Sequence, residues 1–359
     1  MRVEARPSAP KRLVELASGV DALYLSGRAS VPEELFERLG ESRSAAEAVG
    51  AAVPFAVGGT EFSLEPHGWG KYRFCLRHRH GHVGITPSLS LPALRVQPRA
   101  EFLHGAGALG AVEWFEGILG QAVGPLRFGV SRLDLYADWQ GWDLDGDQRR
   151  RFVCRAERRD LHEVDEELTG FEFGRRSTGS ICARIYDKAA EVAAKGTDFW
   201  PDIWGERYDR AFPVHRVEFE FGRQGLREFG VGTPREALDA AGALWASVTE
   251  GWLTYRSPTS HQNRSRWPLA PEWLDVQRAS LREGAAGAER MYEGRRRGQL
   301  RKLMPVLNGY MVSFAALIGA AGMDGACARM PALLRSYEVM SRRKFSERVA
   351  ERVREYQLA

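Results

Sequence analysis

The sequence predicts an α+β protein, with a largely antiparallel sheet and flanking helices followed by an all-helical C-terminal region. Three features of the 359-residue chain support this fold class. Three segments alternate apolar and polar residues with period two, as strands with one packed face do. Further strand-like stretches within the first 230 residues are separated by Gly and Pro. From Thr233 onward, apolar residues recur at helical spacing instead.

The first 125 residues are expected to alternate short strands with two helices. Val20–Ser26 reads as a strand, and Pro32 then opens a helix that places Leu35 and Leu39 four residues apart on one face. Strand-like stretches follow at Thr60–Leu64, Lys71–Leu76, Val83–Thr86 and Leu94–Gln97. Gly107–Gln121 has the apolar spacing of a second helix.

The next hundred residues repeat a similar order of elements. The strands expected here are Val130–Trp139, Phe171–Gly174, Ile181–Lys188 and His215–Phe221. A helix is expected around Asp147–Ala156, and the Trp-rich segment 189–212 reads as an irregular connection. The order of elements therefore hints at two similar halves.

The C-terminal region is expected to be helical and basic. Thr233-Pro-Arg-Glu236 is a capping-box start with proline at the first helical position. Further helices are expected near Pro271–Arg297, Arg301–Ile318 and Met330–Tyr356. We therefore expect a flexible lead-in at residues 1–15, an α+β domain at 16–230 and a helical domain at 231–359.

Charge and cysteine usage narrow the class of protein. Residues 231–359 hold 20 Lys and Arg against 13 Asp and Glu, which suggests a polyanion partner. The four cysteines show no CxxC pair, which favours reduced thiols in a cytoplasm. No apolar run follows the basic N-terminus and no stretch is long enough to span a bilayer, so neither a secretory signal nor membrane contact is expected. Walker-type and GxSxG motifs are absent from the sequence.

Three of the expected strands have one apolar and one reactive face. Their apolar sets are Leu133, Leu135, Ala137 and Trp139; Ile181, Ala183 and Ile185; and Val217, Phe219 and Phe221. Their polar sets are Arg132, Asp134, Tyr136 and Asp138; Arg184, Tyr186 and Lys188; and Arg216, Glu218 and Glu220. If the strands are neighbours, the apolar sets pack on a core and the polar sets face outward together. Such a surface suits phosphodiester chemistry.

Tyr186 is the candidate nucleophile. A phenol has a pKa near 10, so nearby cations such as Arg184, Lys188 or a bound metal would favour its phenolate. The phenolate can also leave again when a DNA hydroxyl attacks a phosphotyrosyl bond, which suits strand transfer. The alternative is an ordinary strand tyrosine, because tyrosine is enriched in strands.

The carboxylates are candidate metal ligands. Asp134 and Asp138 lie about 13 Å apart along one strand, which is too far for one metal unless the strand bulges. A metal is better shared across strands, by Asp134 with Glu218 or Glu220, and oxygen ligands favour Mg²⁺ or Mn²⁺. The alternative is a solvated face of Arg–carboxylate pairs.

Other segments could bind metal or DNA. His78, His80 and His82 would share one face if extended, but Gly81 favours a turn. A second segment, 261–267, combines Arg264 and Arg266 with Trp267, which could contact phosphate and stack on a base. A third group, Arg342, Arg343, Lys344, Arg348 and Arg352, lies on the expected last helix. All of these segments could equally be ordinary surface.

Four motifs within about 90 residues resemble, in order, those of the replication initiation factor family, the Rep initiators of rolling-circle plasmids and phages and their relaxase relatives. They are Arg132-Leu-Asp134-Leu-Tyr-Ala-Asp138, Phe173-Gly174-Arg175-Arg176-Ser177, Arg184-Ile-Tyr186-Asp-Lys188 and Arg216-Val-Glu218-Phe-Glu220. The resemblance implies that Tyr186 attacks DNA at an origin and becomes linked to the 5′ phosphate. It also implies that Asp134, Glu218, Glu220 and Asp138 supply the ligands of a divalent metal.

The expected function is therefore metal-dependent DNA nicking and strand transfer that initiates rolling-circle replication or conjugative transfer. Tyr186 would act with Arg184, Lys188, Arg132 and Arg216, while DNA contacts would come from Arg175, Arg176, Arg264, Arg266 and Trp267. The expected partner is origin or transfer-origin DNA, single-stranded or supercoiled, with a host helicase and a second copy of the chain as further candidates. Two alternatives stay open: a non-catalytic DNA-binding protein on the same fold, and a metal nuclease that uses water.

Overall fold

A computed structural model describes residues 12–164, 167–177, 179–197, 199–283, 307–341 and 344–350. The chain divides into two compact units, Met1–Tyr292 and Glu293–Ala359. The second unit is helical where it is described, at residues 307–317, in α11 (Met323–Ser341) and at residues 345–350. The chain is thus an α+β protein with a C-terminal helical region, as the sequence predicted.

The first unit is built on a sheet of eleven strands within the described residues. In spatial order they are β2 (Val53–Val57), β3 (Thr60–Leu64), β4 (Phe74–His78), β5 (Gly81–Ile85), β6 (Leu94–Pro98), β1 (Val14–Gly27), β7 (Phe128–Gln140), β12 (His215–Gly222), β11 (Ile181–Asp187), β10 (Glu167–Gly174) and β9 (Arg159–Val164). Each pairing between neighbours is antiparallel. The sheet is therefore antiparallel throughout.

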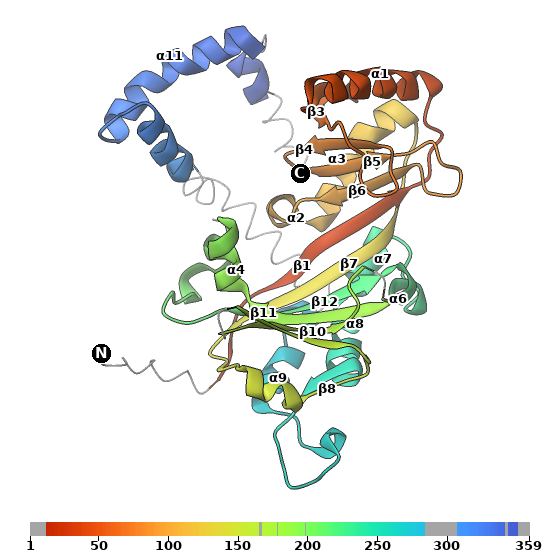
Figure 1. Cartoon of the computed structure of the whole chain (residues 1–359), viewed down its shortest axis with the longest axis vertical. Coiled ribbons are helices and arrows are strands. Elements are labelled where there is room, and N and C mark those ends of the chain that lie inside the picture. The colour runs from red at the N-terminus through yellow and green to blue at the C-terminus, as the bar shows by residue number, and fades with distance from the viewer. Residues whose placement is uncertain are drawn as a thin grey trace. The chain divides into compact units, whose positions relative to one another are not determined.

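The two longest strands, β1 and β7, join two similar halves of this sheet. They pair along their length, from Val14 opposite Gln140 to Gly27 opposite Phe128, and Figure 1 shows them running side by side. In the first half the chain returns to β1 through β6, and in the second half it returns to β7 through β12. This topology agrees with the two halves expected from the order of elements.

One face of the sheet carries the main hydrophobic core. The covering helices are α1 (Glu33–Val49), α2 (Ala100–Ala106), α3 (Ala108–Val123), α6 (Arg223–Glu228), α7 (Pro234–Asp239), α8 (Ala241–Ser247) and α9 (Pro271–Gln277). The predicted apolar strand residues Leu133, Ala183 and Phe219 belong to this core and are fully buried. Trp245 of α8 packs edge-on against the Phe219 ring, 5.3 Å away. The alternation read from the sequence thus placed the apolar faces correctly.

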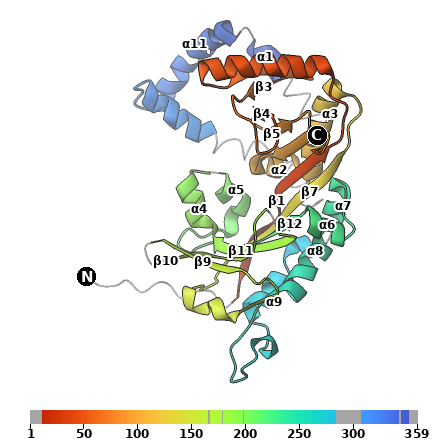
Figure 2. The ribbon, with the colours of Figure 1, turned by 45° about the vertical axis from the view of Figure 1, so that its right-hand side comes forward.

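The opposite face is covered around β7 and β12 by α4 (Lys188–Lys195) and α5 (Trp200–Trp204), which lie together in Figure 2. Their segment was expected to be irregular, and that expectation was wrong. The Asp187 side chain accepts a hydrogen bond from the Ala190 backbone N–H and so caps α4. Trp200 and Trp204 then form a second small core with Tyr136.

Other elements also differ from expectation. The helix expected around Asp147–Ala156 is a short 3-10 turn, Gly146–Arg151, followed by β8 (Phe152–Cys154). This strand pairs with β13 (Leu253–Tyr255), because Phe152 and Tyr255 bury their rings in the core. The Thr233 capping box is present as predicted.

The division of the chain at residue 231 into two functional domains stays a prediction. In the first compact unit, α7, α8 and α9 pack on the sheet through the main core. The lead-in expected at residues 1–15 lies outside the described residues up to residue 11, and β1 begins at Val14. No helix among the described residues is long and apolar enough to cross a membrane.

Candidate active site

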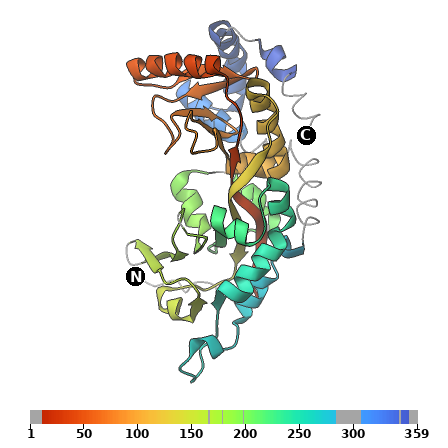
Figure 3. The ribbon, with the colours of Figure 1, turned by 90° about the vertical axis from the view of Figure 1, so that its right-hand side faces the viewer.

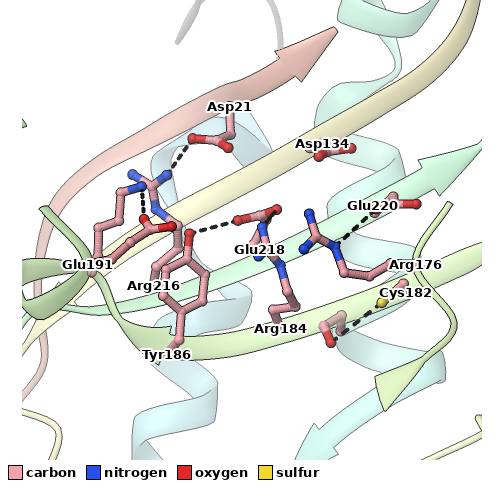
Figure 4. Close-up of polar contacts among 12 residues, drawn as sticks. Asp21, Asp134, Arg176, Cys182, Arg184, Tyr186, Glu191, Arg216, Glu218 and Glu220 are labelled. Atoms are coloured by element: carbon pink, nitrogen blue, oxygen red, sulfur yellow. Dashed lines mark hydrogen bonds and ion pairs between the residues drawn. The ribbon is translucent and has the colours of Figure 1, made fainter. Parts of the chain in front are cut away.

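The three two-faced strands are neighbours in the order β7, β12, β11. The register places Glu220 opposite Asp134 and Arg216 opposite Asp138, and on the other side of β12 it places Tyr186 opposite Arg216. Directly opposite residues of an antiparallel pair share a face. These predicted polar residues therefore gather on one face, and Figure 4 shows all of them except Asp138 labelled in close-up.

Tyr186 is hydrogen-bonded to a carboxylate on the next strand. Its hydroxyl donates to Glu218 Oε2 at 3.0 Å, and Arg184 Nη2 donates to the other oxygen, Oε1. The Arg184 guanidinium also lies 5.0 Å from the centre of the Tyr186 ring. Tyrosine, carboxylate and arginine thus form one connected group (Figure 4).

The environment keeps the Tyr186 phenol protonated. Burial and the negative charge of Glu218 raise the pKa of the phenol well above its ordinary value, against the opposing influence of Arg216 and Arg184. A neutral phenol is a weak nucleophile, so its proton must leave when the oxygen attacks. Glu218 Oε2 is in place to accept that proton.

A second group forms around Asp134. Arg132 binds both oxygens of the Asp134 carboxylate, at 2.8 and 2.5 Å, and its Nη2 lies 2.8 Å from Glu220 Oε2. Burial, with the charges of Glu218 and Glu220, raises the pKa of Asp134 to about 7 against the lowering influence of Arg132. Proton uptake near neutral pH is therefore expected within this group.

The turn between β10 and β11 reaches over the Asp134 group. The backbone N–H of Ser177 donates to Glu220 Oε1 at 2.5 Å, and Arg176 Nε lies 3.8 Å from the other oxygen of that carboxylate. Ser177 has a left-handed backbone with φ of 62°. This strained turn belongs to the predicted Phe173–Ser177 motif, and it brings Arg176 to the polar face.

Asp138 lies in a third, fully buried group. Arg216 donates to both Asp138 oxygens, at 2.7 and 2.8 Å, and also pairs with Asp21 of β1. Both Asp138 and Arg216 are 0% exposed. The guanidinium lies 4.0 Å from the centres of both the Tyr136 and the Trp200 rings. Asp138 thus serves as the counter-ion of Arg216.

Lys188 differs from its predicted place on the β11 strand face. It is the first residue of α4, where its ammonium pairs with Glu191 and lies 5.8 Å from the Tyr186 ring centre. Burial and the charge of Arg216 lower the pKa of Lys188. A lysine in this position is suited to give up a proton.

The carboxylates of the polar face are buried, although the sequence analysis expected this face to point outward, whereas Tyr186 and Arg184 remain partly exposed. Asp134 and Glu218 are each 1% exposed and each is paired with an arginine, while α5 covers the part of this face that carries Tyr136 and Asp138. Four features of this site were not recognised from the sequence: Asp21, Glu191 and the covering residues Trp200 and Trp204. Asp21 occupies the irregularity that separates Val20 from Ala22 in the β1–β7 ladder, and a strand pattern does not reveal such a bulge.

The proposed metal ligands are paired with arginines in this arrangement. The Asp134 and Glu220 carboxylates bind Arg132, and Glu218 binds Arg184, so a cation already faces each of them. Among the described residues, no group of three or more His, Cys, Asp or Glu side chains is placed to hold an ion. Mg²⁺ or Mn²⁺ would have to displace guanidinium groups to bind here.

The histidine segment forms a hairpin turn instead of one extended strand. His78 ends β4, His82 lies in β5, and His80 is in the turn between them. The His80 ring stacks on Phe102 at 4.0 Å, and burial together with His78 lowers the pKa of His80 to about 3. These rings belong to the aromatic packing of the first half of the sheet.

The remaining predicted DNA-binding residues lie in two places. Arg175 belongs to the β10–β11 turn and is exposed, where it lines a surface pocket together with Arg155 and Arg158. Arg264, Arg266 and Trp267 lie in the loop between β13 and α9, which extends away from the sheet in Figures 1 and 3. The structure therefore does not bring this second set to Tyr186. Of the C-terminal basic residues, Arg342, Arg343 and Arg352 lie outside the described residues.

No family model matches this chain, and no curated protein matches it. A solved structure of a rolling circle replication initiator protein from Geobacillus stearothermophilus is similar, with 19% identity and a TM-score of 0.41. The match covers 74% of this chain and 97% of that one. The side chains around Tyr186 are therefore the basis for assigning a function.

Proposed function

We propose that this protein nicks DNA and transfers the cut strand through a covalent tyrosyl-DNA intermediate, initiating rolling-circle replication or conjugative transfer. The observation that supports this most is the group formed by Tyr186, Glu218 and Arg184. This group places a proton acceptor and a cation in contact with the phenol, as activation of a tyrosine nucleophile requires.

The reaction proposed for this group is an in-line attack on a phosphodiester. The Tyr186 oxygen attacks phosphorus and passes its proton to Glu218 Oε2, 3.0 Å away. The bond from phosphorus to the 3′ oxygen breaks, and that oxygen takes up a proton to become a hydroxyl. The 5′ phosphate remains on Tyr186, and attack by a DNA hydroxyl reverses the step.

The surrounding cations would stabilise the charge of the reacting phosphate. Arg184 is the nearest candidate, because it already contacts both the Tyr186 ring and Glu218. Lys188, at the start of α4, also lies near the Tyr186 ring. Its lowered pKa suits it to protonate the leaving oxygen. Arg132 and Arg216 are held by Asp134 and Asp138 and would act as positioning residues.

Metal dependence stays a prediction that the proposed step does not require. Mg²⁺ or Mn²⁺ binding by Asp134, Glu218, Glu220 or Asp138 would need the guanidinium pairs to open. DNA is the partner that the proposed chemistry needs. A host helicase and a homodimer remain predictions.

Covalent capture tests this function. The protein is incubated with supercoiled or single-stranded DNA of its own replicon, with Mg²⁺, Mn²⁺ or EDTA, and protein–DNA adducts are resolved on a denaturing gel. An adduct with the wild-type protein that disappears in Tyr186→Phe supports the proposal. Nicking without an adduct would instead indicate a water-using nuclease, and binding without nicking would indicate a non-catalytic DNA-binding protein.

A further inference from the structure

We propose that an arginine–aromatic track, formed by Tyr24, Trp69, Arg95 and Arg132, binds single-stranded DNA beside Tyr186. One unpaired base would stack on Trp69, and the adjoining phosphate would contact Arg95. This inference rests on the proposed function, because it names where the DNA strand runs after it leaves the reactive tyrosine.

The track is a continuous series of rings and guanidinium groups. The Arg95 guanidinium lies 4.1 Å from the centre of the Trp69 ring and 5.2 Å from that of Tyr24. Tyr24 and Trp69 are stacked at 6.5 Å with an interplanar angle of 30°. Arg132 lies 4.9 Å from the Tyr24 ring. Cation and ring therefore alternate from the active site into the first half of the sheet.

Strand register places these residues on the same face as the active site. Tyr24 of β1 is directly opposite Arg132 of β7, and Arg95 lies on β6, the next strand beyond β1. Arg132 in turn binds Asp134 and Glu220, next to the Tyr186 group. A strand of DNA held at Tyr186 could therefore continue over Arg132 toward Arg95 without leaving this face.

Gly84 allows Trp69 to lie against the sheet. Trp69 and Tyr72 form a β-bridge in the loop before β4, and this loop folds over β5. A Cβ added to Gly84 would lie 2.9 Å from the Tyr72 side chain and 3.2 Å from the Trp69 ring. Gly84 is also directly opposite Arg95. The missing side chain at Gly84 thus makes room for the Trp69–Arg95 contact.

Charge distinguishes Arg95 from the arginines of the active site. Arg132, Arg184 and Arg216 each pair with carboxylates, whereas Arg95 has no ion pair within the part of the chain that the structure describes. Its guanidinium contacts the Tyr24 and Trp69 rings, and both Arg95 and Trp69 remain partly exposed. A fixed cation without a counter-ion beside an accessible ring can take a phosphate and a base together.

The favoured ligand is single-stranded because a base must be unstacked to lie on Trp69. Aromatic platforms combined with cations are the usual means by which proteins bind single strands without reading their sequence. A duplex would instead present its phosphates, with its bases already stacked on one another. A weakening that is equal for single strand and duplex would therefore contradict the proposed stacking.

Fluorescence anisotropy with the full-length protein tests the track. The probe is a labelled oligothymidine of about 20 nucleotides, titrated in EDTA over a range of salt concentrations. We expect Trp69→Ala to weaken binding about tenfold and Trp69→Phe to remain within about twofold of wild type. Arg95→Gln should reduce the slope of log affinity against log salt by about 0.7.

Arg38→Gln is the matched control. Arg38 lies 5.1 Å from the Phe55 ring but belongs to α1 on the core face, so its loss should leave oligothymidine binding unchanged. Circular dichroism shows whether each variant is folded. Trp69→Phe keeps an aromatic ring, so it distinguishes the loss of stacking on the ring from a disturbance of the loop that carries it. Wild-type affinity in both Trp69→Ala and Arg95→Gln would overturn the track.

The adduct assay separates this inference from the proposed function. If wild type forms no adduct while Trp69→Ala still weakens binding, the nicking function is wrong and the track stands. If wild type forms the adduct and the track variants bind normally, the track alone is wrong.

Discussion

Glu218→Gln is predicted to slow adduct formation without abolishing DNA binding. The Gln oxygen can still accept the hydrogen bond that Tyr186 donates to Glu218 at 3.0 Å, but an amide cannot take the proton. Because the pKa of the Tyr186 phenol is raised, few protein molecules carry the phenolate before attack. The loss of the proton acceptor should therefore slow the step in which Tyr186 attacks phosphorus. General bases contribute about 10²–10⁴-fold, which corresponds to roughly 3–5 kcal/mol of activation free energy.

The assay is a single-turnover time course of adduct formation on a single-stranded origin fragment, with protein in excess. Glu61→Gln on β3 is the control, because it removes an exposed carboxylate in the other half of the sheet. Glu218→Gln also removes the counter-ion of Arg184, so thermal melting must show that the variant is folded. A rate within about threefold of wild type would refute proton transfer to Glu218. If excess Mn²⁺ restored the rate of adduct formation in Glu218→Gln, the result would instead indicate that Glu218 is a metal ligand.

Three further predictions concern stability, pH and metal. Asp138→Asn should lower the free energy of unfolding, measured by urea denaturation, by about 3–5 kcal/mol, because it leaves Arg216 buried with only Asp21 as an anionic partner. Asp21→Asn changes a less buried residue and should lower the free energy of unfolding by less. Folding raises the pKa of Asp134 from 3.8 to about 7, so the folded state binds an extra proton and the free energy of unfolding should fall as pH rises from about 4 through 7. Asp134→Asn should flatten this dependence of the free energy of unfolding on pH, and an unchanged dependence would contradict the prediction. EDTA should reduce the adduct yield if the predicted Mg²⁺ or Mn²⁺ is required, whereas an undiminished yield would show that the tyrosine and its arginines suffice.

Strand alternation predicted the faces of the sheet but not their surroundings. The period of two correctly separated Leu133 from Asp134 and Ile185 from Tyr186, because any packed strand must bury one set. It could not predict that a second layer would cover Tyr136 and Asp138 of the polar set. That layer depends on Trp200 and Trp204 in a five-residue helix, which is too short to show a helical period.

Cross-strand partners were predictable only in part. The cross-strand carboxylates were anticipated because Asp134 and Asp138 are too far apart along one strand, and the register does place Glu220 opposite Asp134. The choice of Glu218 as the partner of Tyr186 depends on strand register, which one sequence does not specify. The Asp21 contact depends on a bulge in β1, and the arginine pairing of each carboxylate depends on side-chain packing across strands.

The central claim is that Tyr186 becomes covalently joined to DNA. The most direct measurement is mass spectrometry of the nuclease-trimmed and proteolysed adduct, to identify the modified residue. The account predicts a nucleotide 5′ phosphate attached to the peptide that contains Tyr186, and no such peptide from Tyr186→Phe. A phosphate attached to another residue, or nicked DNA with no modified peptide, would contradict it.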